Sequence, residues 1–177
     1  MAKKILVTGG LGLIGHNIVQ RLEAQGHEVA ITDIRTNYGL VPQEELDYLL
    51  AERRKKITTT RVHAVDIADR DGIDWLVTHY KPDTILHLAS FPRQKVVNVN
   101  PQVGSRTMSE GLLNLLEAAK KHAVGKFVYI SSSMVYGDFD NDVTEDAECR
   151  PQGQYGIMKL AGEWLVRDYT VRTGMAH

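Results

Sequence analysis

Tyr155 and Lys159 stand four positions apart in the segment QYGIMKLAGEW (154–164). On a helix, two residues with this spacing lie on one face, one turn apart. The pKa of a free phenol is about 10, so a phenol acts as a base near pH 7 only if this pKa falls by about three, which costs roughly 4 kcal/mol. A neighbouring ammonium group supplies part of that energy. The pair therefore predicts a tyrosine base assisted by a lysine, although amphipathic helices also show this spacing by chance.

A row of serines provides candidate partners for Tyr155. The apolar run KFVYIS (126–131) predicts a strand, and Ser131, Ser132 and Ser133 follow one another at its end. In an open parallel sheet, residues at the carboxyl ends of the strands face the ligand crevice. The hydroxyl groups are therefore expected to point into that crevice, and the alternative is that they are ordinary turn serines.

A glycine-rich turn, TGGLGLIG (8–15), follows the first predicted strand and opens the first predicted helix. It fits a dinucleotide-binding pattern in two registers, which share Gly12 and Gly15 and begin at Gly9 or at Gly10. Either register gives a tight turn that brings the backbone close to a diphosphate. The free N–H groups and the positive end of the following helix then bind the phosphates.

The second predicted strand, EVAITDI (28–34), carries an acidic residue near its end. Asp33 stands eighteen residues after Gly15, where a carboxylate accepts hydrogen bonds from the adenine ribose hydroxyls and repels a 2′-phosphate. This favours NAD over NADP. Arg35 weakens the preference, because an arginine nearby can pair with a phosphate.

These residues must be positioned by alternating strands and helices. Continuous apolar runs predict strands at 3–8, 28–34, 61–66, 83–89 and 126–131. Apolar residues at helical spacing predict helices at 14–25, 43–56, 70–80, 102–122 and 154–173, of which 43–56 is an extra amphipathic helix. The order predicts an α/β fold with a doubly wound parallel sheet in three layers, a Rossmann fold.

Composition is that of an ordinary globular protein. The chain has 177 residues, of which 43% are hydrophobic and 24% charged, and this predicts one folded unit. A formal net charge of −1 gives no electrostatic reason to expect nucleic acid or an anionic membrane as a partner. The basic run ERRKK (52–56) is interpreted as a solvated helix face. Cys149 is the single cysteine, no metal-binding spacing occurs, and the N-terminus reads as a strand rather than a signal peptide, so a cytoplasmic, metal-free protein is expected.

Taken in order, several of these segments carry a family resemblance: TGGLGLIG, Asp33, Asp66 in VDIAD, HLAS (87–90), SSSMVYG (131–137) and YGIMK (155–159). Their order and separations resemble the extended short-chain dehydrogenase/reductase superfamily. Within it, the chain is most similar to NAD-dependent nucleotide-sugar epimerases and dehydratases. The match spans nearly the whole chain and implies an enzyme that uses NAD.

The resemblance also implies roles for particular residues. Tyr155 would be the catalytic base, Lys159 would bind the nicotinamide ribose and favour the phenolate, and Ser132 would share the proton through a hydrogen bond. Substrate contacts would come from Arg93, Ser132, Ser133 and Tyr155, although Arg93 and Lys95 are slightly better explained as solvated loop charges. The implied cofactor-binding residues are Gly9, Gly12, Leu13, Ile14, Gly15, Asp33, Ile34, Arg35, Asp66, Ile67, Leu88, Ala89, Ser90, Ser131, Tyr155 and Lys159.

The reaction type follows from what stands beside Ser132. The 4,6-dehydratases of this family carry an Asp and Glu pair where this chain has Ser133 and Met134. An epimerase needs no such acids, so epimerisation, at C4 of a UDP-sugar, is the first choice. A dehydratase or sugar reductase is the alternative within the family, and an NAD-binding sensor without catalysis is the alternative from another class.

Four further expectations concern Met108, His87, the length of the chain and its self-association. Met108 stands where the family commonly has an Asn that supports the lysine region, and His87 is expected to be a hydrogen-bonded core residue rather than an acid. The family is longer, with a sixth strand after the Tyr155 helix and a small C-terminal substrate region, so the chain is interpreted as a truncated cofactor domain with an uncovered edge on the fifth strand. A homodimer through the helices at 102–122 and 155–173 is expected.

Overall fold

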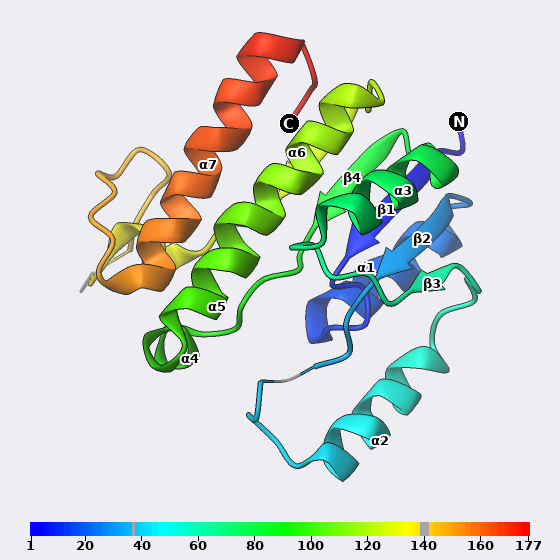
Figure 1. The fold of residues 1–177 in the computed structure, drawn as a ribbon, viewed down its shortest axis with the longest axis horizontal. Coiled ribbons are helices and arrows are strands. Elements are labelled where there is room, and N and C mark those ends of the chain that lie inside the picture. The colour runs from blue at the N-terminus through cyan, green and yellow to red at the C-terminus, as the bar shows by residue number, and fades with distance from the viewer. Residues whose placement is uncertain (37, 139–141) are drawn as a thin grey trace.

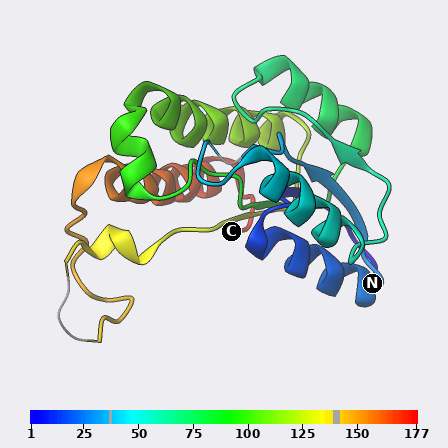
Figure 2. The same ribbon diagram turned by 90° about the horizontal axis from the view of Figure 1, so that it is seen from below.

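The computed structural model describes residues 1–36, 38–138 and 142–177. Five parallel strands form one sheet in the order β3-β2-β1-β4-β5. They are β1 (Lys4–Thr8), β2 (Glu28–Thr32), β3 (Val62–His63), β4 (Thr84–His87) and β5 (Lys126–Tyr129). Helices cover both faces, as Figures 1 and 2 show. The predicted three-layer Rossmann fold is therefore confirmed.

The helices divide between the two faces of the sheet. On one face, α3 (Arg70–Tyr80), α6 (Gly111–Lys121) and α7 (Gly153–Thr173) share a buried core with the strands, while α1 (Leu13–Ala24) packs on the other face (Figure 2). An inserted helix, α2 (Gln43–Arg54), follows β2 and lies beyond the end of the sheet (Figure 1). None of the helices in the described part of the chain is long and apolar enough to cross a membrane.

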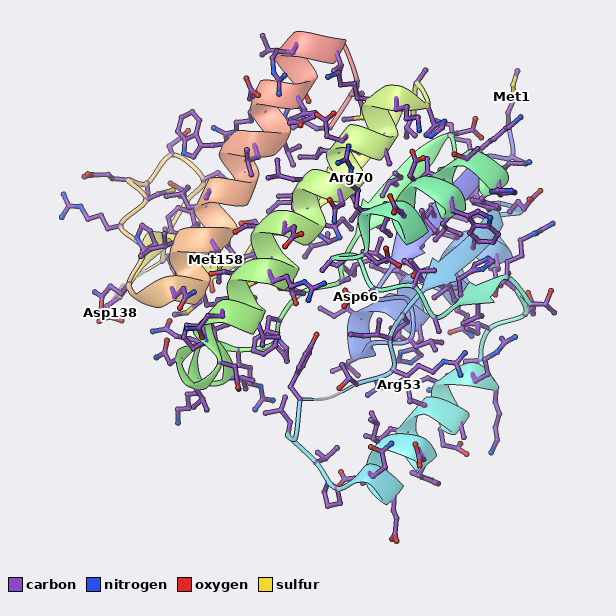
Figure 3. All side chains as sticks on the ribbon, viewed as in Figure 1. Met1, Arg53, Asp66, Arg70, Asp138 and Met158 are labelled. Carbon is purple, nitrogen blue, oxygen red and sulfur yellow. The ribbon has the colours of Figure 1, made fainter. Side chains whose placement is uncertain are left out.

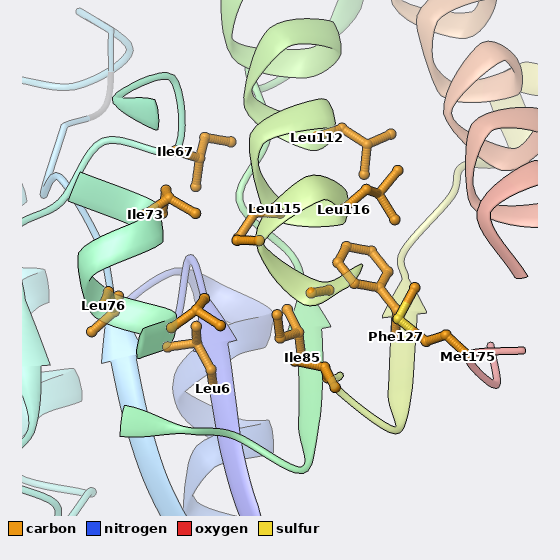
Figure 4. Close-up of a cluster of buried hydrophobic side chains, with 14 of the residues drawn as sticks. Leu6, Ile67, Ile73, Leu76, Ile85, Leu112, Leu115, Leu116, Phe127 and Met175 are labelled. Carbon is orange, nitrogen blue, oxygen red and sulfur yellow. The ribbon is translucent and has the colours of Figure 1, made fainter. Parts of the chain in front are cut away.

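The main core lies between the sheet and the α3, α6 and α7 layer. Leu6, Ile85 and Phe127 from three neighbouring strands meet Leu112 and Leu116 of α6, and none of these side chains is exposed (Figure 4). Burial of a leucine or phenylalanine side chain stabilises the fold by about 1.5–3 kcal/mol. These strands are buried on both faces, which explains why their sequences read as continuous apolar runs.

Local signals set several helix ends. The side chain of Asp69 caps α3 by accepting a hydrogen bond from the Gly72 N–H at 3.1 Å. Lys81 ends this helix in the left-handed conformation, and Pro82 follows it. Gly174, with φ of 72°, ends α7 in the same way. These caps fix where β4 begins and where α7 stops.

The strand predicted at 61–66 is much shorter in the structure. Only Val62 and His63 pair with β2. Beyond them, the carbonyl group of Val65 accepts a hydrogen bond from the Thr32 hydroxyl at 2.7 Å, so a side chain replaces the ladder. Asp66 then turns the chain by accepting the Ala68 N–H at 2.9 Å.

The helix predicted at 102–122 has an irregular structure. It consists of α5 (Pro101–Ser105), a π-helical turn η1 (Arg106–Glu110) and α6, and a short helix α4 (Gln94–Val99) that was not predicted precedes it. Each π turn holds more residues than an α-helical turn, and such turns are frequent at functional sites. The turn places Thr107 and Met108 in two different environments, described below.

Two glycines let α7 lie close to β5 and the residues after it. A Cβ atom at Gly156 would stand 2.5 Å from the Met134 carbonyl oxygen, and one at Gly162 would overlap the Tyr129 hydroxyl. The outer edge of β5 is not fully uncovered, contrary to expectation, because Ala176 forms a parallel bridge with Lys126. The N–H of Phe127 donates to the Ala176 carbonyl at 2.8 Å. The chain thus runs beside β5 where the sixth strand was expected to begin.

Candidate functional site

A cleft of about 200 Å³ opens at the carboxyl ends of β1, β2 and β4. The chain leaves β1 toward β2 on one side and returns to β4 on the other, and ligands of open α/β sheets bind at this kind of switch point. Ten of the residues predicted to bind the cofactor line the cleft: Gly9, Gly12, Asp33, Ile34, Arg35, Asp66, Ile67, Leu88, Ala89 and Ser90.

The glycine turn has the geometry that a diphosphate needs. Gly9 has φ of +69°, and a Cβ atom there would stand 2.8 Å from the backbone nitrogen of Ala89. Gly15 is equally constrained, because its Cβ atom would overlap the Gly9 carbonyl oxygen. Gly9 lines the cleft, whereas Gly10 packs against Ile31, which favours the register that begins at Gly9. The turn therefore fits a dinucleotide.

The first turn of α1 carries two predicted residues that lie outside the cleft lining. Leu13 and Ile14 are 70% and 60% exposed, directly after the N-cap residue Gly12. Their N–H groups belong to the first helical turn, where no carbonyl group of the same helix can accept them. These N–H groups are thus available to an anion at the positive end of the helix.

Asp33 organises the ribose end of the cleft. One carboxylate oxygen accepts the Leu11 N–H at 2.9 Å and the other accepts the Arg35 N–H at 2.8 Å. Each oxygen keeps a free lone pair that a ribose hydroxyl can use. Arg35 adopts φ of 55° and its side chain is exposed at the rim.

The cleft lining includes residues that the sequence reasoning did not identify, among them Tyr38, Arg53 and Thr107. The Tyr38 ring packs against the Phe91 ring, with centroids 4.1 Å apart. Burial raises the pKa of the Tyr38 phenol. Arg53 comes from α2 and Thr107 from the π turn, two elements whose placement no local pattern reveals. The interpretation of ERRKK as a solvated face is wrong for Arg53 and Arg54, which are half-buried and hydrogen-bonded to carbonyl groups.

Tyr155 and Lys159 lie on one face of α7, as predicted. The Lys159 side chain is only 5% exposed, and its Nζ donates to the Ile130 carbonyl oxygen at 2.8 Å. The nitrogen is 5.9 Å from the centre of the Tyr155 ring and 5.0 Å from that of Tyr129. Burial lowers the pKa of the Lys159 ammonium to about 8. The site thus holds a desolvated cation near two phenol rings.

Tyr129 is a second phenol in this group that the sequence reasoning did not identify. Burial raises the pKa of its hydroxyl, and the nearby Tyr155 and Glu163 add to the rise. The aromatic ring attracts the Lys159 ammonium through its electron-rich face. Tyr129 therefore stays protonated while it helps to hold the cation in place.

The three serines after β5 have different environments. Ser131 donates its hydroxyl hydrogen bond to the carboxylate of Glu163, one turn beyond Lys159 on α7. The Ser132 hydroxyl accepts the Met134 N–H at 3.3 Å and caps the short 3₁₀ turn η2 (Ser133–Tyr136). Ser133 is exposed. The predicted cofactor contact of Ser131 stays a prediction, since its hydroxyl is already engaged by Glu163.

An apolar cluster connects the cleft with the Tyr155 region. Phe91, Met108 and Met158 are buried together, with Tyr155 packed against them. Phe91 also contacts Tyr38, which lines the cleft. Tyr155 and Lys159 themselves lie outside the cleft lining, so this cluster is the wall that the two regions share.

His87 is a core residue, as expected. It is 3% exposed, and its Nδ1 is 2.7 Å from the Thr8 hydroxyl. Burial, together with the nearby Lys159, lowers the pKa of the imidazole to about 3. The Thr8 hydroxyl shares a hydrogen bond with the His87 Nδ1 and accepts the Ala89 N–H at 3.1 Å. His87 thus shapes the backbone that lines the cleft.

Arg93 and Lys95 are exposed, at the start of α4, so their predicted contact with substrate stays a prediction. Arg93 has φ of 60° and ψ of 139°, a conformation that residues with a Cβ rarely adopt. Within the described ranges, no group of three or more His, Cys, Asp or Glu side chains is arranged to hold a metal ion.

The sheet order, with the glycine turn after β1 and the Tyr155 helix after β5, defines a short-chain dehydrogenase/reductase fold. The sequence model of the NAD dependent epimerase/dehydratase family matches residues 5–176. The chain belongs to this family, which confirms the resemblance noted in the sequence. NAD is the cofactor of the family, as Asp33 predicted, and the glycine turn and Asp33 fit it.

Individual relatives agree with this assignment. UDP-glucose 4-epimerase 4 of Oryza sativa subsp. japonica is 29% identical over 168 residues, which cover 94% of this chain and 45% of that protein. A dTDP-glucose 4,6-dehydratase of Neisseria meningitidis serogroup B is 30% identical over 190 residues, with 98% and 50% covered. The crystal structure of the UDP-glucose 4-epimerase of Thermus thermophilus with NAD has a TM-score of 0.83 at 28% identity, with 97% and 52% covered. The chain thus spans about half the length of these relatives.

Proposed function

We propose that this chain is the cofactor-binding part of an NAD-dependent nucleotide-sugar epimerase that acts at C4 of a UDP-sugar. One observation carries the proposal. The Lys159 ammonium is buried against the Ile130 carbonyl group, 5.9 Å from the centre of the Tyr155 ring. A cation fixed beside a phenol favours the phenolate, which a proton acceptor requires.

Each residue then has a defined role in the proposed reaction. Tyr155 takes the proton from the sugar hydroxyl and later returns it, and Ser132 holds that hydroxyl by a hydrogen bond. Lys159 stabilises the phenolate and binds the nicotinamide ribose. When bound, NAD would supply reversible hydride transfer at the sugar carbon, whose hydroxyl proton Tyr155 holds.

The choice of epimerase over dehydratase rests on η2. Ser133 and Met134 follow Ser132 in this turn, and neither carries a carboxylic acid for the elimination of water. The Met134 carbonyl oxygen lies against Gly156, so α7 holds the backbone of the turn. A dehydratase or reductase of the same family is the alternative. A dehydratase would yield a product of changed mass. A reductase would accumulate the cofactor in its oxidised or reduced form.

Two measurements on the 177-residue chain test the proposal. We expect calorimetry to show NAD binding. We expect a coupled assay with UDP-glucose or UDP-glucuronate to show slow turnover or none, because the chain spans only about half the length of relatives that act as whole enzymes. Rapid turnover would contradict the second expectation, and failure to bind NAD would contradict the proposal itself.

A non-catalytic NAD sensor is a second candidate, favoured by the apolar surroundings of Tyr155 at Met108. Tyr155→Phe separates the two functions in the full-length protein. An enzyme should lose about 10²-fold or more in turnover and keep its NAD affinity, because a general base contributes this much. A sensor with Tyr155→Phe should keep its response to NAD, because that response does not need a catalytic base.

A homodimer through α6 and α7 belongs to the same proposal. Exposed apolar side chains lie on these helices, among them Leu113, Ile157, Trp164 and Val171. Sedimentation should show a dimer that Trp164→Glu weakens, whereas Tyr48→Glu, at an exposed position on α2, serves as a control outside the two helices. The cytoplasmic location and the single-domain organisation of residues 1–177 stay predictions from the sequence.

A further inference from the structure

The inserted helix α2 lines the cleft with Leu46, Leu50 and Arg53, and of these three Arg53 carries the charge. Arg53, at the end of this helix, is half-buried and lines the cleft together with Asp33 and Gly12. Figure 3 shows Arg53 between α2 and the rest of the domain. The neighbouring Arg54 has a different environment, since its guanidinium donates to the carbonyl groups of Ile57 and Thr59 and does not line the cleft.

Arg53 is bonded to the glycine turn. Its Nη1 donates to the Leu11 carbonyl oxygen at 3.0 Å, and the Leu11 N–H donates to the Asp33 carboxylate at 2.9 Å. Leu11 stands between Gly10 and Gly12, immediately before α1. A single residue of the turn is thus held by a cation on its carbonyl side and by an anion on its N–H side.

The guanidinium of Arg53 forms no ion pair with the residues that the structure describes. Among residues 1–36, 38–138 and 142–177, no carboxylate lies within ion-pair distance of its guanidinium, and its bond to Leu11 uses one of five N–H donors. A half-buried cation that faces a cleft favours an anionic ligand. The turn that Arg53 touches is the part of the site that fits a diphosphate.

We propose that Arg53 is a cofactor-binding residue of this chain, supplied by the inserted helix. It fixes Leu11 in the glycine turn and donates its remaining N–H groups to the phosphates of the dinucleotide. The inference rests on the proposed binding of NAD and adds to it a contact that the glycine pattern and Asp33 do not provide. Helix α2 is then a functional part of the cofactor site rather than a surface insertion.

Calorimetric titration of NAD into matched variants tests this inference. Arg53→Met should weaken NAD binding by about tenfold or more, and Arg53→Lys should recover part of the loss, because an ammonium keeps the charge but not the planar donors. Arg54→Met removes the same charge from the same helix and loosens its end, and it should leave the affinity within about twofold.

Salt dependence separates a phosphate contact from a loss of α2 packing. With Arg53 in place, NAD affinity should fall more steeply with ionic strength than in Arg53→Met, because the salt screens a contact that this variant lacks. Equal affinities and salt slopes in the unmodified chain and Arg53→Met would overturn the inference, as would an equal loss in Arg54→Met. If the unmodified chain itself does not bind NAD, both the proposed function and the Arg53 inference fail. If the unmodified chain binds NAD and Arg53→Met binds it equally well, only the Arg53 inference fails.

Discussion

The Nζ atom of Lys159 lies 2.8 Å from the carbonyl oxygen of Ile130, the first residue after β5. This bond joins the middle of α7 to the end of the strand that leads into the serine row. Because Lys159 is almost fully buried, its ammonium has exchanged water for one carbonyl group and two aromatic rings. The consequence is a charged group whose protonation state is linked to folding.

Stability should therefore depend on pH through Lys159. Its pKa is about 8 in the folded chain, against about 10.4 for an unperturbed lysine. Between these values the unfolded chain binds more protons, so this group makes stability rise with pH from about 8 to about 10.4. Below pH 8 the buried Lys159 ammonium is charged, and its burial lowers the free energy of unfolding by the full amount, roughly 3 kcal/mol.

Urea unfolding of Lys159→Met checks this effect. We expect the variant to be more stable than the parent chain near pH 7, and the difference should shrink as the pH approaches about 10.4. Taking the difference between the two proteins cancels the titration of other groups. A difference that stays constant over this pH range would contradict the assignment.

The bond from Ser131 to Glu163 should position the serine row. Glu163→Ala removes the acceptor, whereas Glu163→Gln keeps a carbonyl oxygen that can accept the same bond. We expect Glu163→Ala to lower turnover in the proposed epimerase reaction by about tenfold and Glu163→Gln by much less, because a hydroxyl–carboxylate bond contributes about 1.5–3 kcal/mol.

A double variant shows whether the two residues act together. If Glu163 acts through Ser131, combining Glu163→Ala with Ser131→Ala should cost no more than either change alone. Asp168→Asn, an exposed carboxylate farther along α7 that pairs with Arg172, is the matched control. Additive losses in the double variant would show that the bond does not transmit the effect.

Close contact between α7 and β5 depends on Gly162. A Cβ atom there would overlap the Tyr129 hydroxyl, so Gly162→Ala should destabilise the fold by about 1–3 kcal/mol, measured by urea unfolding. Tyr129→Phe removes the hydroxyl but keeps the ring carbon Cζ, 2.6 Å from the added Cβ atom, so it should restore only part of this loss. Gly125→Ala is the control, because its Cβ atom would make an ordinary 3.5 Å contact with the Asp83 carbonyl oxygen. A stable Gly162→Ala variant would contradict the packing described.

The surroundings of Met108 predict its tolerance to substitution. It is 4% exposed and packs with Phe91, Val97 and Met158. Met108→Asn introduces the amide common in the family into an apolar cluster and should cost about 2–4 kcal/mol of stability in urea unfolding. Met108→Leu should cost less than about 1.5 kcal/mol. Equal stabilities of the two variants would reveal a polar partner in this cluster.

The sequence predicted those parts of the molecule that local pattern determines. Buried parallel strands read as apolar runs, so β1, β2, β4 and β5 were predicted within a few residues. The glycine turn and Asp33 were predicted because their spacing within one βαβ unit is fixed by a bound dinucleotide. Tyr155 and Lys159 were placed on one helix face because helical periodicity requires it.

Contacts between distant segments were not predictable in the same way. Arg53 reaches Leu11 across 42 residues, and the basic run that contains it has the composition of a solvated face. Tyr38 meets Phe91 only because two loops converge over the cleft. The shortening of β3 depends on the Thr32 hydroxyl, which bonds to Val65 in place of the ladder. Each of these contacts follows from tertiary packing, which overrides local preference.

The π turn η1 divides two adjacent side chains between two environments. Thr107 faces the cleft, and its neighbour Met108 packs in the cluster beside Tyr155. A π turn holds about one residue more than an α-helical turn. Deleting one residue between 106 and 110 would therefore leave a regular α-helix in which α5 and α6 keep nearly the same orientation, because the lost residue is the one that the wider turn accommodates. The deletion should thus displace Thr107 and Met108 while the flanking helices stay in register.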